Sequence, residues 1–304
     1  MSLIPLPIRE ASARAEKALQ EKKTAQTLLT KKQSHQPITA LTAYDYPTAH
    51  LVDQAGIDLL LVGDSLGMAV LGYDSTLPVT MDEMLHHTRA VRRAVKSALL
   101  VVDMPFGTYH ASAEQAVLNA TRFIKESGVE AVKIEGGRNR AALVATLTQA
   151  EIAVVGHIGL TPQSVHRMGY RVQGKTISAI DDLLADALAL EAAGAIAIVL
   201  ECVPREAAAH ITAALSIPTI GIGAGPDCDG QILVFHDLVN LTGGHTAKFV
   251  RRYADAGALF TEAIEHYRDD VTQRAFPSDA ESYHLPREAA EALSNPEEIQ
   301  LLHR

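Results

Sequence analysis

Short runs of apolar, often β-branched residues recur along this chain, and each ends in a polar side chain close to Gly, Pro or Ser. A continuous apolar run of this kind is typical of a strand that is buried on both faces, as in a parallel sheet. The runs are IDLLLVGDS (57–65), ALLVVDMPF (98–106), EAVKIEGG (130–137), IAVVGHIGLTP (152–162), AIAIVLECVP (195–204) and IPTIGIGAGP (217–226). The pattern therefore predicts an α/β fold whose strands carry polar groups at their carboxyl ends.

Helical patterns alternate with these strands. Two further strands are expected, over 38–44 at the start of the series and over 230–238 at its end. About eight strand–helix repeats over roughly 230 residues favour a closed (β/α)8 TIM barrel, with a doubly wound open sheet as the alternative. The helices are expected over 45–56, 84–96, 112–128, 139–151, 178–194, 204–216 and 255–272.

The order of predicted helices and strands divides the chain into three segments. A helical pattern at 11–33 precedes the first strand and defines an N-terminal helical extension over 1–36. The catalytic barrel is expected over 37–283, and a polar C-terminal tail over 284–304. Within the barrel, the long Gly-containing loop at 161–176 is more typical of a lid or of the wall of a site than of a simple connection.

The composition limits the class of protein. The chain has 304 residues, of which 47% are hydrophobic, and its formal net charge of −9 disfavours nucleic acid or an anionic membrane as the main partner. No apolar run is long enough to span a bilayer, and the first residues lack the apolar core of a signal peptide. Cys202 and Cys228 form neither a disulfide framework nor a zinc motif. We expect a cytoplasmic protein in a reducing compartment.

Three carboxylates, Asp64, Asp103 and Glu135, stand at the ends of predicted strands. In a barrel these ends meet at the face where active sites lie. Carboxylate oxygens suit Mg²⁺, which also retains water and takes ligands from substrate. The three residues therefore predict a metal site, and the alternative is that each caps a helix or pairs with a nearby cation.

Lys133 lies two residues before Glu135, so the two side chains point to the same face of a strand. A buried unpaired ammonium is costly, which predicts either that Lys133 holds an anionic substrate or that it forms a structural ion pair. Ser65 is a candidate donor to a substrate carboxylate, with a local turn as the alternative.

Glu201 ends the run AIAIVL, and we expect it to act as a general base, with a helix N-terminal charge as the alternative. Apolar surroundings raise the pKa of a carboxyl group and so suit such a base. His157 interrupts an apolar strand between Gly156 and Gly159. A histidine in this position is more often a core residue, but the two glycines favour close approach of a ligand.

Several longer words strengthen the enzyme interpretation. They are TAYDYPTA, LVGDSLGM, GYDSTLPVT, VKIEGG, GHIGLTPQS, ALALEAAGA, LECVP, IGIGAGPDCDGQILVFHD and TGGHTAKFV. In this order, from about residue 38 to about residue 283, they closely resemble the ketopantoate hydroxymethyltransferase (3-methyl-2-oxobutanoate hydroxymethyltransferase) family.

The resemblance implies a (β/α)8 barrel that uses Mg²⁺ and 5,10-methylenetetrahydrofolate to convert 3-methyl-2-oxobutanoate into ketopantoate (2-dehydropantoate), through a Mg-stabilised enolate, in pantothenate and coenzyme A biosynthesis. It also implies a homo-oligomer, commonly a homodecamer. By motif it places the metal on Asp64, Asp103 and Glu135, the base on Glu201, and the keto acid beside Asp64, Ser65, Asp103, Lys133 and His157.

Two other functions compete with this one. A Mg²⁺-dependent lyase of the isocitrate lyase or phosphoenolpyruvate mutase type shares the enolate chemistry, but typically needs a nucleophilic Cys. Here Cys202 directly follows Glu201 and so points to the opposite face of the strand. The second alternative is a catalytically dead barrel that serves as a binding scaffold, which would be expected to have lost a metal carboxylate or Glu201.

Overall fold

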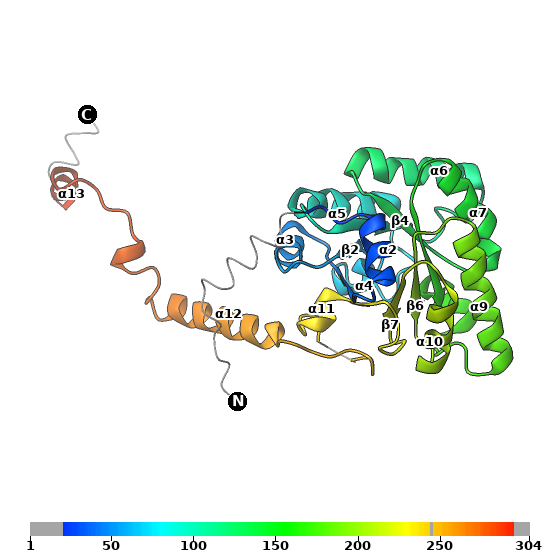
Figure 1. The fold of residues 1–304 in the computed structure, drawn as a ribbon. Helices are drawn as coiled ribbons and strands as arrows, with labels where there is room; N and C mark the ends of the chain where they lie inside the picture. The colour runs from blue at the N-terminus through cyan, green and yellow to red at the C-terminus, as the bar shows by residue number, and fades with distance from the viewer. Residues whose placement is uncertain (1–20, 244–245, 295–304) are drawn as a thin grey trace. The chain divides into compact units, whose positions relative to one another are not determined.

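The protein forms a closed barrel of eight parallel strands that follow one another in chain order (Figure 1). The computed structural model describes residues 21–243 and 246–294. The strands are β1 (Ile38–Thr42), β2 (Leu59–Val62), β3 (Leu99–Asp103), β4 (Ala131–Glu135), β5 (Val154–Gly159), β6 (Ala197–Glu201), β7 (Thr219–Ile222) and β8 (Gly230–Leu233). Closure of the sheet confirms the predicted TIM barrel and excludes the open-sheet alternative.

Helices connect the strands and surround them on the outside (Figure 1). Helices α3, α5, α6 and α9 each start after a residue whose side chain accepts a hydrogen bond from a backbone N–H of the first turn: Asp45, Thr80, Ser112 and Thr176. They are α3 (Tyr46–Gln54), α4 (Leu66–Ala69), α5 (Met81–Ala94), α6 (Ala113–Arg122), which continues as the π-turn Phe123–Ser127, α7 (Arg138–Gln149), α8 (Val165–Met168), α9 (Ile177–Ala192), α10 (Arg205–Ala214) and α11 (Phe235–Leu238).

Two boundaries differ from the sequence-based expectation. The helix expected from residue 84 begins at Met81, because the Thr80 and Glu83 side chains each bond the other's backbone N–H in a capping box. The strand expected over 230–238 ends at Leu233, and the chain turns there into the short helix α11.

The strand register brings the polar strand ends together. In the parallel pairing, Asp103 of β3 lies opposite Lys133 of β4, and Glu135 lies opposite His157 of β5. Glu201 of β6 lies opposite Gly159 of the same neighbouring strand β5. Residues that are far apart in sequence therefore stand side by side at one end of the barrel.

Two hydrophobic cores hold this arrangement. The larger core fills the space between the outer face of the sheet and the surrounding helices. The smaller core fills the barrel interior with side chains such as Ile38, Leu99, Val155 and Ile232, and it also includes Leu28. The interior below the polar strand ends is therefore packed with side chains, as is usual for barrels of this size.

Leu28 belongs to α2 (Ala25–Gln33), which lies against the N-terminal end of the barrel. The side chain of Leu28 is fully buried. Lys31 Nζ lies 2.6 Å from Asp58 Oδ2, just before β2, and Lys32 Nζ lies 2.8 Å from Asp229 Oδ2, just before β8. The expected helix over 11–33 is therefore present from Ala25 and closes one end of the barrel, while residues 1–20 lie outside the described part.

The chain divides into two compact units between Tyr253 and Ala254. The barrel and α2 belong to the first unit, whereas the sequence analysis placed the end of the barrel domain at residue 283. The second unit contains α12 (Ala256–Thr272), which matches the helix expected over 255–272, and α13 (Arg287–Ser294). None of the helices in the described residues is long and apolar enough to cross a membrane.

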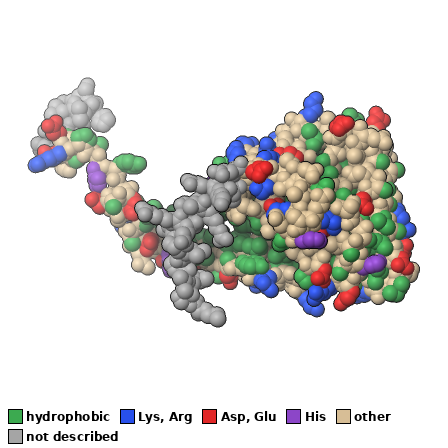
Figure 2. Space-filling model, in the orientation of Figure 1, with side chains coloured by type: hydrophobic (Ala, Val, Ile, Leu, Met, Phe, Trp, Pro, Cys, Tyr) green, Lys and Arg blue, Asp and Glu red, His purple; other side chains and the backbone are tan. Residues whose placement is uncertain are grey.

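Acidic and basic side chains are interspersed over the barrel on the face shown in Figure 2, without segregation by sign. This mixed distribution matches the moderate overall charge of the chain. The polar groups that stand out are instead the buried ones at the C-terminal ends of the strands.

Candidate active site

A pocket of about 160 Å³ lies at the C-terminal ends of the strands. It is lined by residues from strands all around the barrel, including Thr42 of β1, Lys133 of β4 and Glu201 of β6. All seven site residues that the sequence singled out line this one pocket: Asp64, Ser65, Asp103, Lys133, Glu135, His157 and Glu201. The structure thus brings together side chains from β3, β4, β5 and β6 and from the turn after β2.

Asp64 and Asp103 form the acidic side of the pocket. Both are buried, and the backbone N–H of Asp64 donates to Asp103 Oδ2 at 3.0 Å. Burial raises the pKa of Asp64 well above its usual value, and the charges of Asp103 and Glu135 raise it further. A site that disfavours its own negative charge in this way is suited to receive a cation.

Lys133 supplies a buried positive charge next to these carboxylates. Its Nζ lies 2.9 Å from Asp103 Oδ1 and 3.0 Å from His157 Nδ1. The contact with Asp103 is an ion pair rather than a well-aligned hydrogen bond, since Asp103 Oδ1 has no hydrogen-bond partner. Burial lowers the pKa of Lys133, but the charges of Asp103, Glu135 and Asp64 outweigh this effect and raise it, so the ammonium stays charged.

His157 bridges two carboxylates. Its Nδ1 lies 3.5 Å from Glu135 Oε1, and its Nε2 lies 3.2 Å from Glu201 Oε2. Burial and the ammonium of Lys133 lower the pKa of His157, but the contacts with Glu135 and Glu201 prevail and raise it. The contact between Lys133 Nζ and His157 Nδ1 is a hydrogen bond when the ammonium donates and Nδ1 carries no proton.

The surroundings of Glu201 and of His157 differ from those expected from the sequence. Glu201 was expected in an apolar setting, and the structure places its carboxylate beside the imidazole of His157 instead. Burial raises the pKa of Glu135, yet the contact with His157 and the charge of Lys133 hold it below its usual value. His157 is thus a buried polar link between strands rather than an isolated core residue.

Gln163, which the sequence analysis did not single out, connects both sides of the site. Its Nε2 donates to Asp64 Oδ2 at 2.8 Å and to Met104 O at 3.0 Å, and its backbone N–H donates to Glu135 Oε2 at 3.0 Å. Its Oε1 accepts from the hydroxyl of Tyr109 at 2.6 Å. The only sequence signal was its place in the 161–176 loop, which was expected to be part of a site wall.

Ser65 is held by a second residue that the sequence analysis did not single out. The hydroxyls of Ser65 and Tyr44 lie 2.7 Å apart, and Tyr44 is fully buried. Ser65 starts α4 but makes no side-chain capping bond to that helix. Burial raises the pKa of Tyr44, so its hydroxyl remains protonated and able to donate. The Ser65 hydroxyl is therefore positioned at the pocket rather than used for a local turn.

The carboxylates of Asp64, Asp103 and Glu135 differ in how well they are placed to bind one metal ion. Among the described residues, no three His, Cys, Asp or Glu side chains are arranged to hold a metal ion as they stand. Asp64 and Asp103 are adjacent, whereas Glu135 is turned toward His157 and Gln163. Mg²⁺ is commonly held by one or two carboxylates together with water and substrate oxygens. The pair Asp64 and Asp103 therefore fits this ion.

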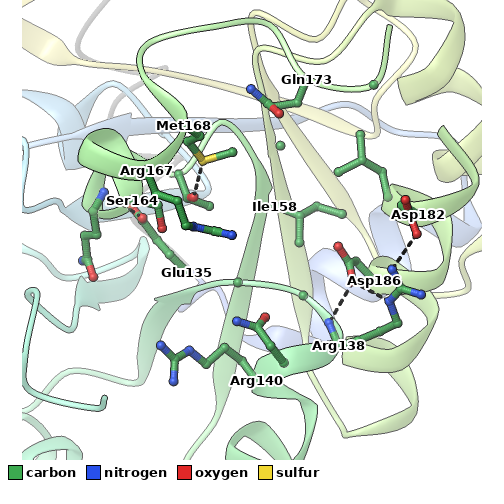
Figure 3. Close-up of a pocket in the computed structure, with 18 of the residues that line it drawn as sticks. Glu135, Arg138, Arg140, Ile158, Ser164, Arg167, Met168, Gln173, Asp182 and Asp186 are labelled. Carbon is green, nitrogen blue, oxygen red and sulfur yellow. Dashed lines mark hydrogen bonds and ion pairs between the residues drawn. The ribbon is translucent and has the colours of Figure 1, made fainter. Parts of the chain in front are cut away.

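A larger pocket of about 650 Å³ adjoins the first one and shares Glu135 with it. Figure 3 shows this pocket, with Arg138 tied to Asp182 and Asp186 on one side and Arg167 pointing inward near Glu135. The candidate active site thus consists of a small charged pocket at the barrel axis and a wider polar pocket next to it.

A closed parallel barrel with buried carboxylates, a lysine and a histidine at its C-terminal end defines a TIM-barrel enzyme. The model of the family described as "Ketopantoate hydroxymethyltransferase" matches residues 22–279. The chain belongs to this family of transferases, which confirms the family and the class of enzyme expected from the sequence words.

Relatives and solved structures agree with this assignment. The 3-methyl-2-oxobutanoate hydroxymethyltransferase of Koribacter versatilis (strain Ellin345) is 66% identical over 273 residues, covering 90% of this chain and 92% of the relative. That of Thermoanaerobacter sp. (strain X514) is 53% identical, covering 88% and 98%. Phosphonopyruvate hydrolase, solved in complex with oxalate and Mg²⁺, has a TM-score of 0.57 at 14% identity, covering 92% of this chain and 98% of the other.

A 2,3-dimethylmalate lyase of the PEP mutase/isocitrate lyase superfamily has a TM-score of 0.54 at 16% identity, covering 92% of this chain and 97% of the lyase. At these identities the two solved structures show a shared fold alone. The lyase alternative is therefore supported by the fold only, whereas the transferase family is shown by the sequence.

Proposed function

We propose that the protein transfers a hydroxymethyl group from 5,10-methylenetetrahydrofolate to 3-methyl-2-oxobutanoate and forms 2-dehydropantoate (ketopantoate) for pantothenate and coenzyme A biosynthesis. Family membership and the name of the 66%-identical relative support this reaction. The observation that carries the proposal is that Lys133, Glu201 and the carboxylates Asp64 and Asp103 line one small pocket at the catalytic end of the barrel.

The keto acid would bind in the 160 Å³ pocket through its carboxylate. Lys133 is buried, charged and fixed between Asp103 and His157, so it can pair with a substrate carboxylate without first being ordered. Ser65 adds a hydroxyl donor from the turn after β2, held in place by Tyr44. This pair of donors would orient the acid with its C3 hydrogen toward the remaining polar groups.

Glu201 would remove the proton from C3. Its side chain is 16% exposed and lines the pocket, and one of its oxygens faces His157 Nε2 at 3.2 Å. That contact leaves the other oxygen available to the substrate. A positioned base of this kind typically contributes about 10²–10⁴-fold to the rate. His157 would respond to protonation of Glu201 because it lies between Glu201 and Lys133.

Asp64 and Asp103 would hold Mg²⁺, with Glu135 completing the carboxylate set at the neighbouring strand end. When bound, the ion acts as a Lewis acid that stabilises negative charge on the keto oxygen. The fit rests on the donor chemistry and on the repulsion that raises the pKa of Asp64. Gln163 would orient this set, since it bonds both Asp64 and Glu135.

The proposed reaction balances with one water. A carbon–carbon bond forms between C3 of the keto acid and the one-carbon unit, and the two bonds from that carbon to the folate nitrogens break. The oxygen of the water becomes the new hydroxyl group. The C3 proton and one proton of the water end on the two nitrogens of tetrahydrofolate.

The deciding experiment is an assay of ketopantoate formation from the two substrates, with Mg²⁺ and with EDTA, alongside exchange of the C3 proton in D₂O. Metal-dependent product supports the whole proposal. Exchange without product would keep the keto acid site and reject the folate donor. A folded protein with neither signal would be the catalytically dead binding scaffold.

We further propose a cytoplasmic homo-oligomer, with the decamer as the expected size. Both cysteines are free, which supports a reducing compartment. Within the second unit, α12 exposes Phe260, Ile264 and Tyr267 at helical spacing, an apolar stripe suited to contact a second copy. Light scattering of the full chain measures the mass of the particle, and a monomer would contradict this part.

A further inference from the structure

The 650 Å³ pocket has a floor built from the segment GGRNR (136–140), which follows β4. Gly136 has φ +120°, and a Cβ there would lie 2.7 Å from Arg140 Cγ. A Cβ on Gly137 would lie 2.1 Å from Asp186 Cγ. The two glycines therefore allow the chain to turn tightly enough for the following arginines to line the pocket.

The three arginines of the pocket differ in their partners. Arg138 is neutralised by Asp182, at 2.8 Å, and by Asp186, at 2.9 Å. Arg140 and Arg167 form no ion pair with any carboxylate in the described part of the chain. Glu135, the remaining acid of the pocket, is engaged by His157 and by the backbone of Gln163. Two guanidinium groups of the pocket therefore have no ion-pair partner among the described residues.

The side chain of Arg140 is held in place, although its hydrogen-bonding capacity is not fully used. Its Nε is buried and has no hydrogen-bond partner, although an unpaired buried donor is costly. Its guanidinium lies 5.3 Å from the ring centroid of Tyr109, a cation–π contact that fixes its position. Arg140 therefore keeps its guanidinium at the edge of this pocket without an ion-pair partner in the described residues, at a cost in stability.

Arg167 comes from α8 in the 161–176 loop. Figure 3 shows its side chain extending into the pocket near Glu135, away from the cluster of Arg138, Asp182 and Asp186. Arg140 also points away from that cluster (Figure 3). The pocket therefore presents two separate guanidinium groups to a ligand, and each can pair with one carboxylate.

We propose that this pocket binds the acidic tail of the folate donor and that Arg140 and Arg167 pair with its glutamate carboxylates. This inference rests on the proposed function, which requires a second substrate much larger than the keto acid. The 160 Å³ pocket has no room for both substrates, whereas the adjoining pocket is within the size range of sites for drug-sized ligands. The shared residue Glu135 places the two ligands next to each other.

The test measures binding of tetrahydrofolate, the product form of the donor, by calorimetry under anaerobic conditions. Arg167→Met and Arg140→Met should each weaken binding roughly tenfold, as is typical for loss of a hydrogen bond to a charged group. The control Arg93→Met removes the same charge from an exposed position on α5 outside the pocket and should bind as the wild type does. Unchanged tetrahydrofolate affinity in both pocket variants would overturn the inference.

A second readout separates the inference from the proposed function. Exchange of the C3 proton in D₂O needs only the keto acid pocket, so both variants should retain it, which also shows that they are folded. The KM for 5,10-methylenetetrahydrofolate should rise in each variant, while the KM for the keto acid stays the same. If the wild type binds no tetrahydrofolate and forms no product, the proposed function itself fails. If it does both and the variants match it, the arginine assignment alone fails.

Discussion

His157 Nε2 lies 3.2 Å from Glu201 Oε2, and Nδ1 of the same ring lies 3.0 Å from Lys133 Nζ. One buried ring therefore touches both the proposed base and the proposed anchor of the substrate carboxylate. When Glu201 takes up a proton, the charge facing His157 falls, and the change reaches Lys133 through the ring. If Glu201 and Lys133 have the proposed roles, we expect proton transfer and substrate binding to be coupled across β4, β5 and β6.

The role of Glu201 as base is tested by Glu201→Gln. The variant should still bind 3-methyl-2-oxobutanoate, because Lys133 and Ser65 are untouched, and C3 proton exchange should fall by about 10²–10⁴-fold. NMR in D₂O measures the exchange directly. The control Glu206→Gln changes an exposed glutamate on α10 and should exchange normally. Normal exchange in Glu201→Gln would assign the base to another residue.

Asp64→Asn should show how much the cluster of buried carboxylates lowers the stability of the fold. Asp64 is buried beside Asp103 and Glu135, and their repulsion disfavours its charge. In EDTA near neutral pH, the variant should melt higher than the wild type, and a gain of about 1 kcal/mol corresponds to roughly 1.5–2 °C in a chain of this size. Added Mg²⁺ should then stabilise the wild type but not the variant. Equal Mg²⁺ stabilisation of both proteins would place the metal elsewhere.

Gln163→Met should act through the residues that Gln163 positions. The change keeps the length of the side chain but removes its bonds to Asp64, Met104 and Tyr109. We expect the Mg²⁺ concentration needed for half-maximal activity to rise roughly tenfold, in line with the 10–100-fold cost of losing a group that orients metal ligands. Gln149→Met, at an exposed helix end, is the matched control. A lower kcat with unchanged Mg²⁺ dependence would argue against this positioning role.

Leu28→Ala should lower the free energy of unfolding by about 2–5 kcal/mol, as is typical for truncation of a fully buried leucine. Leu28 packs into the barrel interior, so the loss should appear in urea unfolding of the barrel itself. Leu118→Ala, at a position 61% exposed, should change stability little. If the two variants unfold alike, α2 does not contribute to the core of the barrel in solution.

Glu83 should make stability depend on pH. The hydrogen bond from Tyr73, followed by that from the Thr80 backbone, holds the pKa of Glu83 below its usual value. A carboxyl with a lower pKa in the folded chain stabilises above the unfolded-state pKa, and this stabilisation disappears as the pH falls through the folded-state pKa. Glu83→Gln should therefore cost about 0.5 kcal/mol or less near neutral pH, because the group is solvent-screened.

At acid pH, below the folded-state pKa, Glu83→Gln and the wild type should unfold at the same urea concentration. Glu114→Gln, in the exposed first turn of α6, serves as the comparison. A cost of Glu83→Gln that persists unchanged in acid would mean that the capping geometry, rather than the charge, carries the contribution.

The barrel and the polar strand ends were predictable because both leave a regular trace in the sequence. Apolar runs such as AIAIVL mark strands buried on two faces, and the residue after each run faces the catalytic end. Parallel pairing in chain order then brings Asp103, Lys133, Glu135 and His157 together without any further information.

The residues that hold these groups were not predictable in the same way. Tyr109 lies in a loop and Gln163 in the short 3-10 helix Pro162–Ser164, where no repeat fixes the direction of a side chain, and their mutual bond joins positions 54 residues apart. Tyr44 ends an apolar run and reads as an ordinary core residue. Leu28 lies in a helix with little amphipathic pattern, so its insertion into the barrel leaves no clear signal.

Helix α2 also limits the routes by which small molecules can reach the active site. With Leu28 seated among the interior side chains and Lys31 and Lys32 tied to the strand starts, there is no passage along the barrel axis. We therefore expect the proposed reactants and products to enter and leave at the C-terminal ends of the strands alone. The keto acid would then have to bind before the bulkier donor and to leave after it. The packed barrel interior, which α2 closes at its N-terminal end, would in this way impose an order of binding at the site.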